Sequence, residues 1–100
     1  MNTLVVKAII NLFENSDRIY KTGLIVDFSI RDDMLNSGKI EFLNKKYAKS
    51  GEMNIYAQIT FAYKDLVLPF IQKEVYYIFG EPSFAYGKCK ILGLIGKKYE

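Results

Sequence analysis

MNIYAQITFAY, residues 53–63, is the stretch that decides the fold, because apolar side chains recur in it at every second position. A period of two places alternate residues on opposite faces of a β-strand. One face then meets a core and the other meets solvent or a partner, which is typical of half-buried antiparallel sheet. The core face comprises Ile55, Ala57, Ile59, Phe61 and Tyr63, and the outer face comprises Asn54, Tyr56, Gln58, Thr60 and Ala62.

The same alternation continues toward both ends of the chain. In the first stretch an amphipathic helix is the alternative, but the abundance of Val and Ile and the lack of a capping box favour a strand. Its core face would carry Val6, Ala8, Ile10 and Leu12. Further strands are predicted over residues 3–13, 24–30, 39–43, 75–79 and 84–95, in addition to 53–63.

Polar, glycine-containing or proline-containing segments separate these strands. Gly23 would open the second strand with an unusual backbone conformation, and Gly87 and Gly93 would mark bulges or close approaches in the last strand. Pro69 cannot donate to a sheet ladder, so its segment is predicted as loop or sheet edge. The predicted connections are a polar turn at 14–18, a charged turn at 31–37, a basic loop at 44–52, a loop at 64–73 and a turn at 80–82.

Six or seven strands with this spacing predict one all-β domain over residues 1–100. A closed barrel and a sandwich both fit the pattern. We favour a small antiparallel Greek-key-like β-barrel of six or seven strands.

Composition narrows the functional classes. The 14 Lys and Arg residues against 11 Asp and Glu give a net charge of +3, which is weak for a dedicated duplex-binding domain, so we expect no DNA partner. Histidine is absent, which removes the commonest general base and metal ligand. The single cysteine, Cys89, is expected to be a buried hydrophobe. We therefore predict a protein that is not an enzyme and that uses no metal or cofactor.

The expected location is the cytoplasm. A lone cysteine cannot form an intramolecular disulfide, which suits a reducing compartment. The apolar runs are far shorter than the roughly 20 residues that span a bilayer, and the first residues lack the pattern of a secretory signal. No membrane association is therefore expected.

The order of the motifs resembles the C-terminal β-barrel domain, domain three, of elongation factor Tu. Ser37-Gly38-Lys39-Ile40-Glu41-Phe42 is similar to the family's Thr-Gly-x-Ile-x-Leu motif. Ser50-Gly51-Glu52 and the strand after it are similar to its Pro-Gly-Asp/Glu followed by an alternating strand. The likeness runs from about Val6 to Leu94 and implies the same barrel in a stand-alone protein.

The departures from that family concern function. The arginines that the family carries in two loops are replaced near Ile25 and Ser83, so the resemblance does not extend to transfer-RNA binding. The chain also lacks the Gly-x-x-x-x-Gly-Lys-Ser/Thr motif that would hold the phosphates of a nucleotide.

Surface lysines and aromatic residues are the candidate functional groups. Lysines near tyrosines suit single-stranded RNA or an acidic protein surface, and they equally serve solubility and edge protection. Tyr56, Tyr77 and Phe79 are expected on the outer face, as docking groups or packed beneath long loops. The candidate partner-binding residues are Lys45, Lys46, Tyr47, Lys49, Tyr56, Tyr77, Phe79, Tyr86, Lys88 and Lys90.

The leading functional hypothesis is a cytoplasmic protein-binding module. One concrete form is an immunity protein that neutralises a bacterial toxin domain, by analogy with other barrels that act by covering a partner. The alternative is an RNA-binding or translation-associated accessory protein. The sequence does not indicate the oligomeric state.

Overall fold

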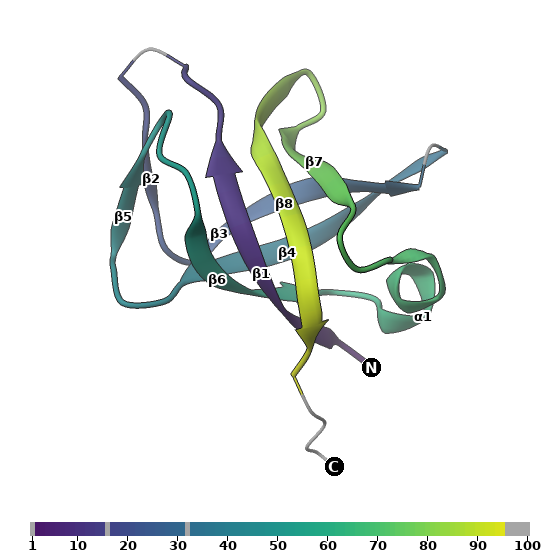
Figure 1. The fold of residues 1–100 in the computed structure, drawn as a ribbon. Helices are drawn as coiled ribbons and strands as arrows, with labels where there is room; N and C mark the ends of the chain where they lie inside the picture. Colours follow the sequence, from purple (N-terminus) through teal and green to yellow (C-terminus); the bar gives the residue numbers. More distant parts are fainter. Residues whose placement is uncertain (1, 16, 32, 96–100) are drawn as a thin grey trace.

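β-Structure dominates the computed structural model, which describes residues 2–15, 17–31 and 33–95 (Figure 1). Two short helical turns lie between the sixth and seventh strands: α1 (Lys64–Val67) and a 3₁₀ helix over Leu68–Phe70. The strands are β1 (Leu4–Leu12), β2 (Ile19–Lys21), β3 (Leu24–Arg31), β4 (Met34–Phe42), β5 (Tyr47–Lys49), β6 (Ile55–Phe61), β7 (Tyr76–Glu81) and β8 (Phe84–Leu94).

Six strands close into an antiparallel barrel in the order β1-β6-β4-β3-β7-β8, and β8 pairs back to β1. β3, β4 and β6 follow one another among the barrel strands and lie side by side, while β1 returns to lie beyond β6. This is a Greek-key arrangement. The predicted all-β barrel is therefore confirmed. The remaining strands, β2 and β5, pair only with each other and form a two-stranded ribbon beside the barrel (Figure 1).

The inward-facing side chains of the six strands fill the barrel. At the centre, the ring of Phe28 lies 4.9 Å from that of Phe61 and 5.5 Å from that of Phe79, measured between centroids. The core faces predicted for β1 and β6 are confirmed, except for Tyr63, which lies beyond the end of β6 and is 56% exposed. The largest fully buried side chains are Phe28, Phe61, Phe79, Ile10, Ile40, Ile59, Ile91, Val6, Val67 and Cys89.

The turn predicted over residues 31–37 is wrong for most of its length, because β4 already begins at Met34. Its first two inward positions are Asn36 and Gly38, so the alternation of apolar residues is hidden there. A Cβ on Gly38 would lie 2.8 Å from Cε1 of Phe28, so the phenylalanine ring occupies the space of the missing side chain. Tertiary contacts therefore make this segment a core strand: it pairs with β3 and β6, and the rings of Phe28 and Phe61 pack over Gly38.

Two other predicted loops contain secondary structure. β5 lies within the predicted basic loop and pairs with β2, which the alternation did not reveal because each strand has three residues. The segment around Pro69 forms α1 and the 3₁₀ helix, and it places Val67 in the core with no exposed surface. Proline suits the first turn of a helix because its missing N–H is not needed there.

The predicted roles of Gly87 and Gly93 in the last strand are confirmed. A Cβ on Gly87 would lie 2.3 Å from the backbone oxygen of Asn11, so β8 can approach β1 only with glycine here. Gly93 lies opposite Lys7, and the next pair joins Ala8 to Ile91, so one residue of β8 bulges out beside Gly93.

Candidate functional site

The candidate residues that the structure leaves accessible fall on two separate surfaces. Tyr56, Lys88 and Lys90 lie on the outer side of β6, β1, β8 and β7. The remaining accessible candidates, Lys45, Lys46, Tyr47 and Lys49, lie on or next to β5 in the ribbon. We call the first surface, made of Lys7, Ile9, Tyr56, Tyr76, Ile78, Lys88 and Lys90, the β8 wall. The second, made of Ile19, Lys21, Tyr47 and Lys49, is the ribbon face.

Strand register builds the β8 wall. Residues that oppose each other across antiparallel strands point to the same face. Ile9 opposes Tyr56 on one side and Lys90 on the other, and Lys90 in turn opposes Tyr76. A row of four outward side chains therefore crosses β6, β1, β8 and β7. In the next row Lys88 opposes Ile78.

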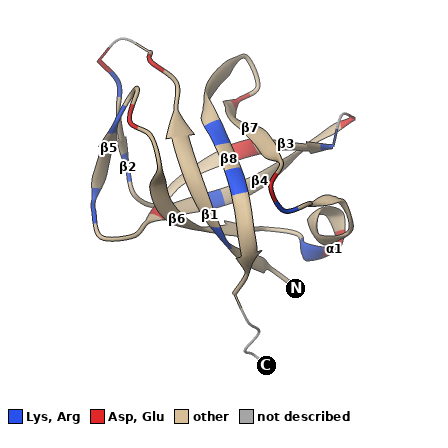
Figure 2. Ribbon diagram, viewed as in Figure 1, with Lys and Arg blue, Asp and Glu red and all other residues tan. Residues whose placement is uncertain are grey.

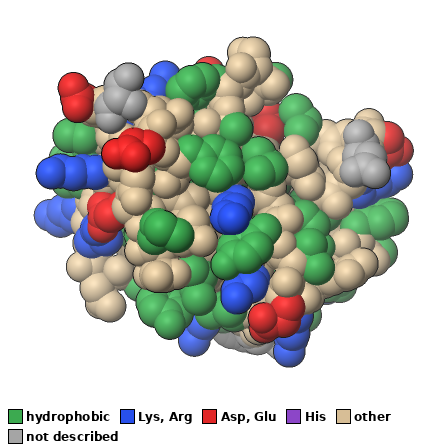
Figure 3. All heavy atoms as spheres, turned by 45° about the horizontal axis from the view of Figure 1, so that its top comes forward, with side chains coloured by type: hydrophobic (Ala, Val, Ile, Leu, Met, Phe, Trp, Pro, Cys, Tyr) green, Lys and Arg blue, Asp and Glu red, His purple; other side chains and the backbone are tan. Residues whose placement is uncertain are grey.

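The β8 wall combines apolar surface with positive charge. Tyr56 is 54% exposed, and Tyr76 and Ile78 are each 42% exposed. The Lys88 ammonium lies 4.5 Å from the centroid of the Tyr76 ring, and that of Lys90 lies 5.4 Å from it. Figure 2 shows the two basic positions on β8, and Figure 3 shows basic side chains set among hydrophobic ones.

Among the described residues, Glu74 is the acidic residue that forms an ion pair with this wall. Glu74, in the connection before β7, places Oε1 3.6 Å from Nζ of Lys90, and its side chain is 75% exposed. An ion pair this exposed contributes little and is easily exchanged for a partner's carboxylate. The wall therefore presents two ammonium groups held near the ring of Tyr76.

The ribbon face is also basic. Ile19 opposes Lys49 and Lys21 opposes Tyr47, so these four side chains point outward together. The middle pair, Tyr20 and Ala48, points toward the barrel and is buried. Lys45 is not free to act in the same way, because its ammonium forms an ion pair with Glu52. Lys46 is exposed beside the ribbon.

The Glu52 carboxylate contacts two residues at one end of the ribbon. It pairs with the Lys45 ammonium and also accepts a 2.8 Å hydrogen bond from the backbone N–H of Lys49. The Lys45 ammonium, and then the Lys49 N–H, lower the pKa of the Glu52 carboxyl below its ordinary value. A negative charge at Glu52 therefore favours the folded ribbon.

We expect the Glu52→Gln substitution to lower the free energy of unfolding at neutral pH. In acid the substitution should make no difference. A carboxyl with a lowered folded-state pKa stabilises fully above its unfolded-state pKa of about 4.3, and this stabilisation is lost as pH falls through the folded value. The loss at pH 7 is below about 1 kcal/mol because the pair is partly exposed. Urea unfolding of both proteins at neutral pH and near pH 3 measures it. A difference that persists in acid would contradict the assignment.

Three predicted surface residues lie in the core instead. Tyr77 is 7% exposed, Phe79 is 1% exposed and Tyr86 is 8% exposed, so the predicted outward orientation of Tyr77 and Phe79 is wrong. The Tyr77 hydroxyl accepts a 2.8 Å hydrogen bond from the Gln72 N–H, which agrees with the alternative of packing beneath a connecting segment.

A one-residue bulge explains the error. A simple two-residue turn after Glu81 would place Tyr77 opposite Lys88. The register instead shifts between Phe79 and Gly80, so Tyr77 opposes the buried Cys89. A shift of one residue exchanges the two faces of a strand. Tyr76 and Ile78 thus take the outward positions, and only knowledge of the bulge could have identified them from the sequence.

Cys89 is buried as predicted, with no exposed surface. Burial raises the pKa of its thiol to about 12, so the sulfur is protonated at neutral pH. The residue behaves as a small core side chain between its neighbours on β8.

The chain matches no model of a known protein family, and no curated protein matches it. Neither described helix has the length and apolar character that crossing a bilayer requires.

Proposed function

We propose that this protein is a non-enzymatic protein-binding module that holds an acidic partner on the β8 wall. The observation that carries the proposal is the row of outward side chains in which Tyr56 and Tyr76 stand at the two ends, with Ile9 and Lys90 between them. Exposed aromatic residues are typical anchors of protein interfaces, and cations at their edge select a partner of opposite charge.

The barrel suits this role because it presents the wall on a rigid sheet. All four strands of the wall are paired on both sides, so little conformational freedom remains to be lost on binding. The concrete form we propose is an immunity protein that covers the working surface of a bacterial toxin domain. We further propose that it acts in the cytoplasm, where a single thiol stays reduced. Kinship with domain three of elongation factor Tu is likewise a proposal, supported by the order of the sequence motifs.

RNA binding is the second candidate function, and the ribbon face favours it. Tyr47 is 55% exposed, and Lys21 and Lys49 accompany it on the same side of the ribbon. Aromatic rings stack on bases while lysines meet phosphates. Such binding would weaken steeply as salt is added.

Affinity capture from a native lysate treated with ribonuclease tests the leading function. The Tyr56→Ala/Tyr76→Ala double variant is expected to retain less than about one tenth of the partner that the unchanged protein captures, because both aromatic anchors are lost. Both side chains are largely exposed, so circular dichroism should remain that of the folded barrel. Quantitative mass spectrometry of the captured protein measures the loss.

The matched control is Lys21→Gln/Tyr47→Ala on the ribbon face, which should capture as much partner as the unchanged protein. Capture that disappears with ribonuclease and with the ribbon variant would contradict the proposal and favour RNA binding. For the immunity form, expression of the captured protein alone should stop growth, and co-expression with this protein should restore it.

A further inference from the structure

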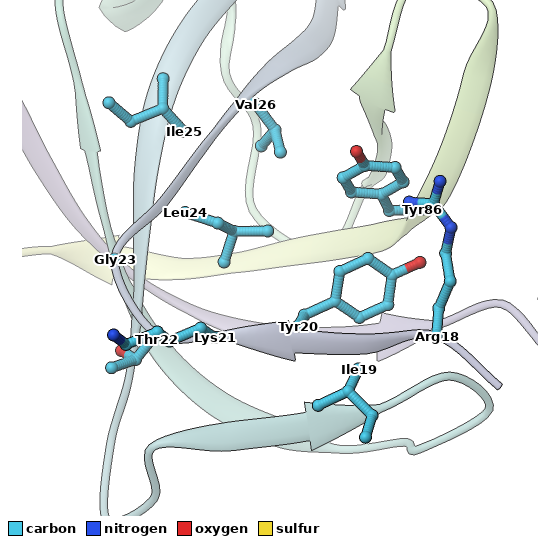
Figure 4. Close-up of a pocket in the computed structure, with 10 residues that line it drawn as sticks. All are labelled: Arg18, Ile19, Tyr20, Lys21, Thr22, Gly23, Leu24, Ile25, Val26 and Tyr86. Carbon is cyan, nitrogen blue, oxygen red and sulfur yellow. The ribbon is translucent and has the colours of Figure 1, made fainter.

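A cleft of about 390 Å³ lies beside the ribbon and shares no residue with the β8 wall (Figure 4). The cleft is lined by β2, the turn at Thr22 and Gly23, and the first residues of β3. Tyr86 from β8 closes one end. The chain turns sharply here because Gly23 adopts a φ of 91°, a conformation that glycine reaches without strain. The turn brings a cation, two tyrosines and an apolar strand together.

Arg18 supplies the positive charge of the cleft and is held in place by aromatic rings. Its guanidinium carbon lies 4.6 Å from the centroid of the Phe84 ring and 5.1 Å from that of Tyr86. The Tyr86 hydroxyl donates a 2.5 Å hydrogen bond to Oε2 of Glu81, which fixes that ring. A guanidinium stacked in this way is pre-organised, and its five N–H donors exceed what the two neighbouring hydroxyls can accept, which leaves donors for an anion.

Tyr20 contributes a buried hydroxyl at the same end of the cleft. The residue is 5% exposed, and its ring packs 4.9 Å from that of Tyr86. The hydroxyl oxygen is buried and makes no hydrogen bond of good geometry to any residue in the described part of the chain. Figure 4 shows it pointing toward the Arg18 side chain.

Hydrogen-bonding contact with the Tyr86 hydroxyl, and to a lesser extent with the Tyr20 hydroxyl, raises the pKa of the Arg18 guanidinium. The Tyr20 hydroxyl thus lies within reach of Arg18 but has no partner in good geometry in the described part of the chain. A buried hydroxyl without a partner is unfavourable, so such groups in native proteins commonly serve a ligand or an ordered solvent molecule. One end of the cleft thus offers a fixed guanidinium and a hydroxyl donor side by side.

The rest of the lining combines the apolar start of β3 with Lys21 and Thr22, and it includes no acidic residue. Leu24, Ile25 and Val26 form this apolar part, and Ile25 is 71% exposed. Lys21 is the other charged residue of the lining. The Glu81 carboxylate, outside the lining, accepts the hydrogen bond of the Tyr86 hydroxyl. This distribution suits a ligand with one anionic end and an apolar body.

We propose that this cleft binds a carboxylate that carries an apolar group. The carboxylate would accept hydrogen bonds from the Arg18 guanidinium and the Tyr20 hydroxyl, and the apolar group would lie along Leu24 and Val26. A planar carboxylate can accept two parallel N–H bonds from one guanidinium, which gives direction as well as strength. Both a small carboxylic acid and the C-terminal residue of a peptide with an apolar side chain have this chemistry.

Titration with hexanoate, followed by nuclear magnetic resonance of the Arg18 side chain and the amides of residues 19–26, tests the proposal. We expect saturable shifts at these positions, with a Kd on the order of 1 mM for so small a ligand. Hexanol has the same apolar chain without the charge and should bind at least about tenfold more weakly. Shifts that do not saturate at about ten times the expected Kd, or equal binding of hexanol, would overturn the proposal.

Two variants separate the roles of the polar groups. Tyr20→Phe removes only the hydroxyl and should weaken hexanoate about fivefold, and Arg18→Gln should weaken it at least about tenfold. Both should stay folded, since the lost hydroxyl has no partner in the described chain and Arg18 is exposed. Arg31→Gln and Tyr47→Phe are the matched controls and should leave binding unchanged. Equal effects of variants and controls would contradict the assignment.

A pair of short peptides ending in Val-Leu distinguishes the two sources of the carboxylate. If the site reads a chain terminus, the peptide with a free C-terminal carboxylate binds more tightly than hexanoate, and its C-terminal amide loses that binding. If only hexanoate binds, the ligand is a small free acid. Binding of the amide as tight as that of the free peptide would contradict a carboxylate site.

Discussion

Gly87→Ala is expected to lower the free energy of unfolding by more than about 3 kcal/mol, a large part of the 5–15 kcal/mol typical of a whole domain. The new Cβ would lie 2.3 Å from the Asn11 carbonyl oxygen and 3.0 Å from Cα of Leu12. Both atoms belong to the backbone of β1, so no side-chain rotation can relieve the clash. Separating β1 from β8 would open the barrel along that seam. Urea-induced unfolding followed by circular dichroism measures the change.

Gly93→Ala provides a control on the same strand. A Cβ at Gly93 would meet no atom within 4 Å, so the substitution should change the free energy of unfolding by less than about 1 kcal/mol. The two variants add the same methyl group to β8 and differ only in the distance of β1. Similar stabilities of the two variants would show that the barrel does not depend on the close approach at Gly87.

Phe28→Ala is expected to cost about 3–5 kcal/mol, because it removes the ring at the centre of the barrel. Phe28 has no exposed surface, and its ring contacts those of Phe61 and Phe79 from β6 and β7. A cavity bordered by two rigid strands can collapse only in part, so the loss exceeds that of the transferred surface alone. The midpoint of urea unfolding should fall with little change in its slope.

Two comparisons make this prediction specific. Phe70→Ala removes a ring that is 42% exposed and should cost less than about 1 kcal/mol. Gly38→Ala should be destabilising alone, since its Cβ would lie 2.8 Å from the Phe28 ring, but should cost much less when Phe28 is already alanine. Additive effects of the two substitutions would contradict the contact between them.

Where the alternation of apolar and polar residues is unbroken, the sequence was sufficient to predict both the strand and which of its side chains point into the core. β1 and β6 behave in this way: Val6, Ala8 and Ile10 on β1 and Ile55 and Ala57 on β6 are all buried, as predicted. The signal is local because successive side chains on a strand must point to opposite faces. Each residue's own type then indicates whether its face meets water or the core.

The candidate sites were predicted only in part, because they depend on how strands meet. Lys88 and Lys90 of the β8 wall could be assigned from the sequence, since the phase of β8 follows from its apolar residues. Their neighbours Tyr76 and Ile78 could not, because both faces of β7 are apolar and a bulge sets the facing. The cleft residues Arg18 and Tyr20 carried no sequence signal, since β2 is only three residues long.

The amino-acid sequence by itself determined that this chain forms an all-β domain with a lysine-bearing outer surface. Tertiary structure alone decided the register between strands, the closure of β8 on β1, and the meeting of Arg18 with Tyr20 and Tyr86. The physical reason is the distance along the chain between the residues that determine each feature. The side of the sheet to which each side chain points is set by its position among adjacent residues. The register between strands is set by contacts between residues far apart in the chain, such as the approach of Gly87 to Asn11.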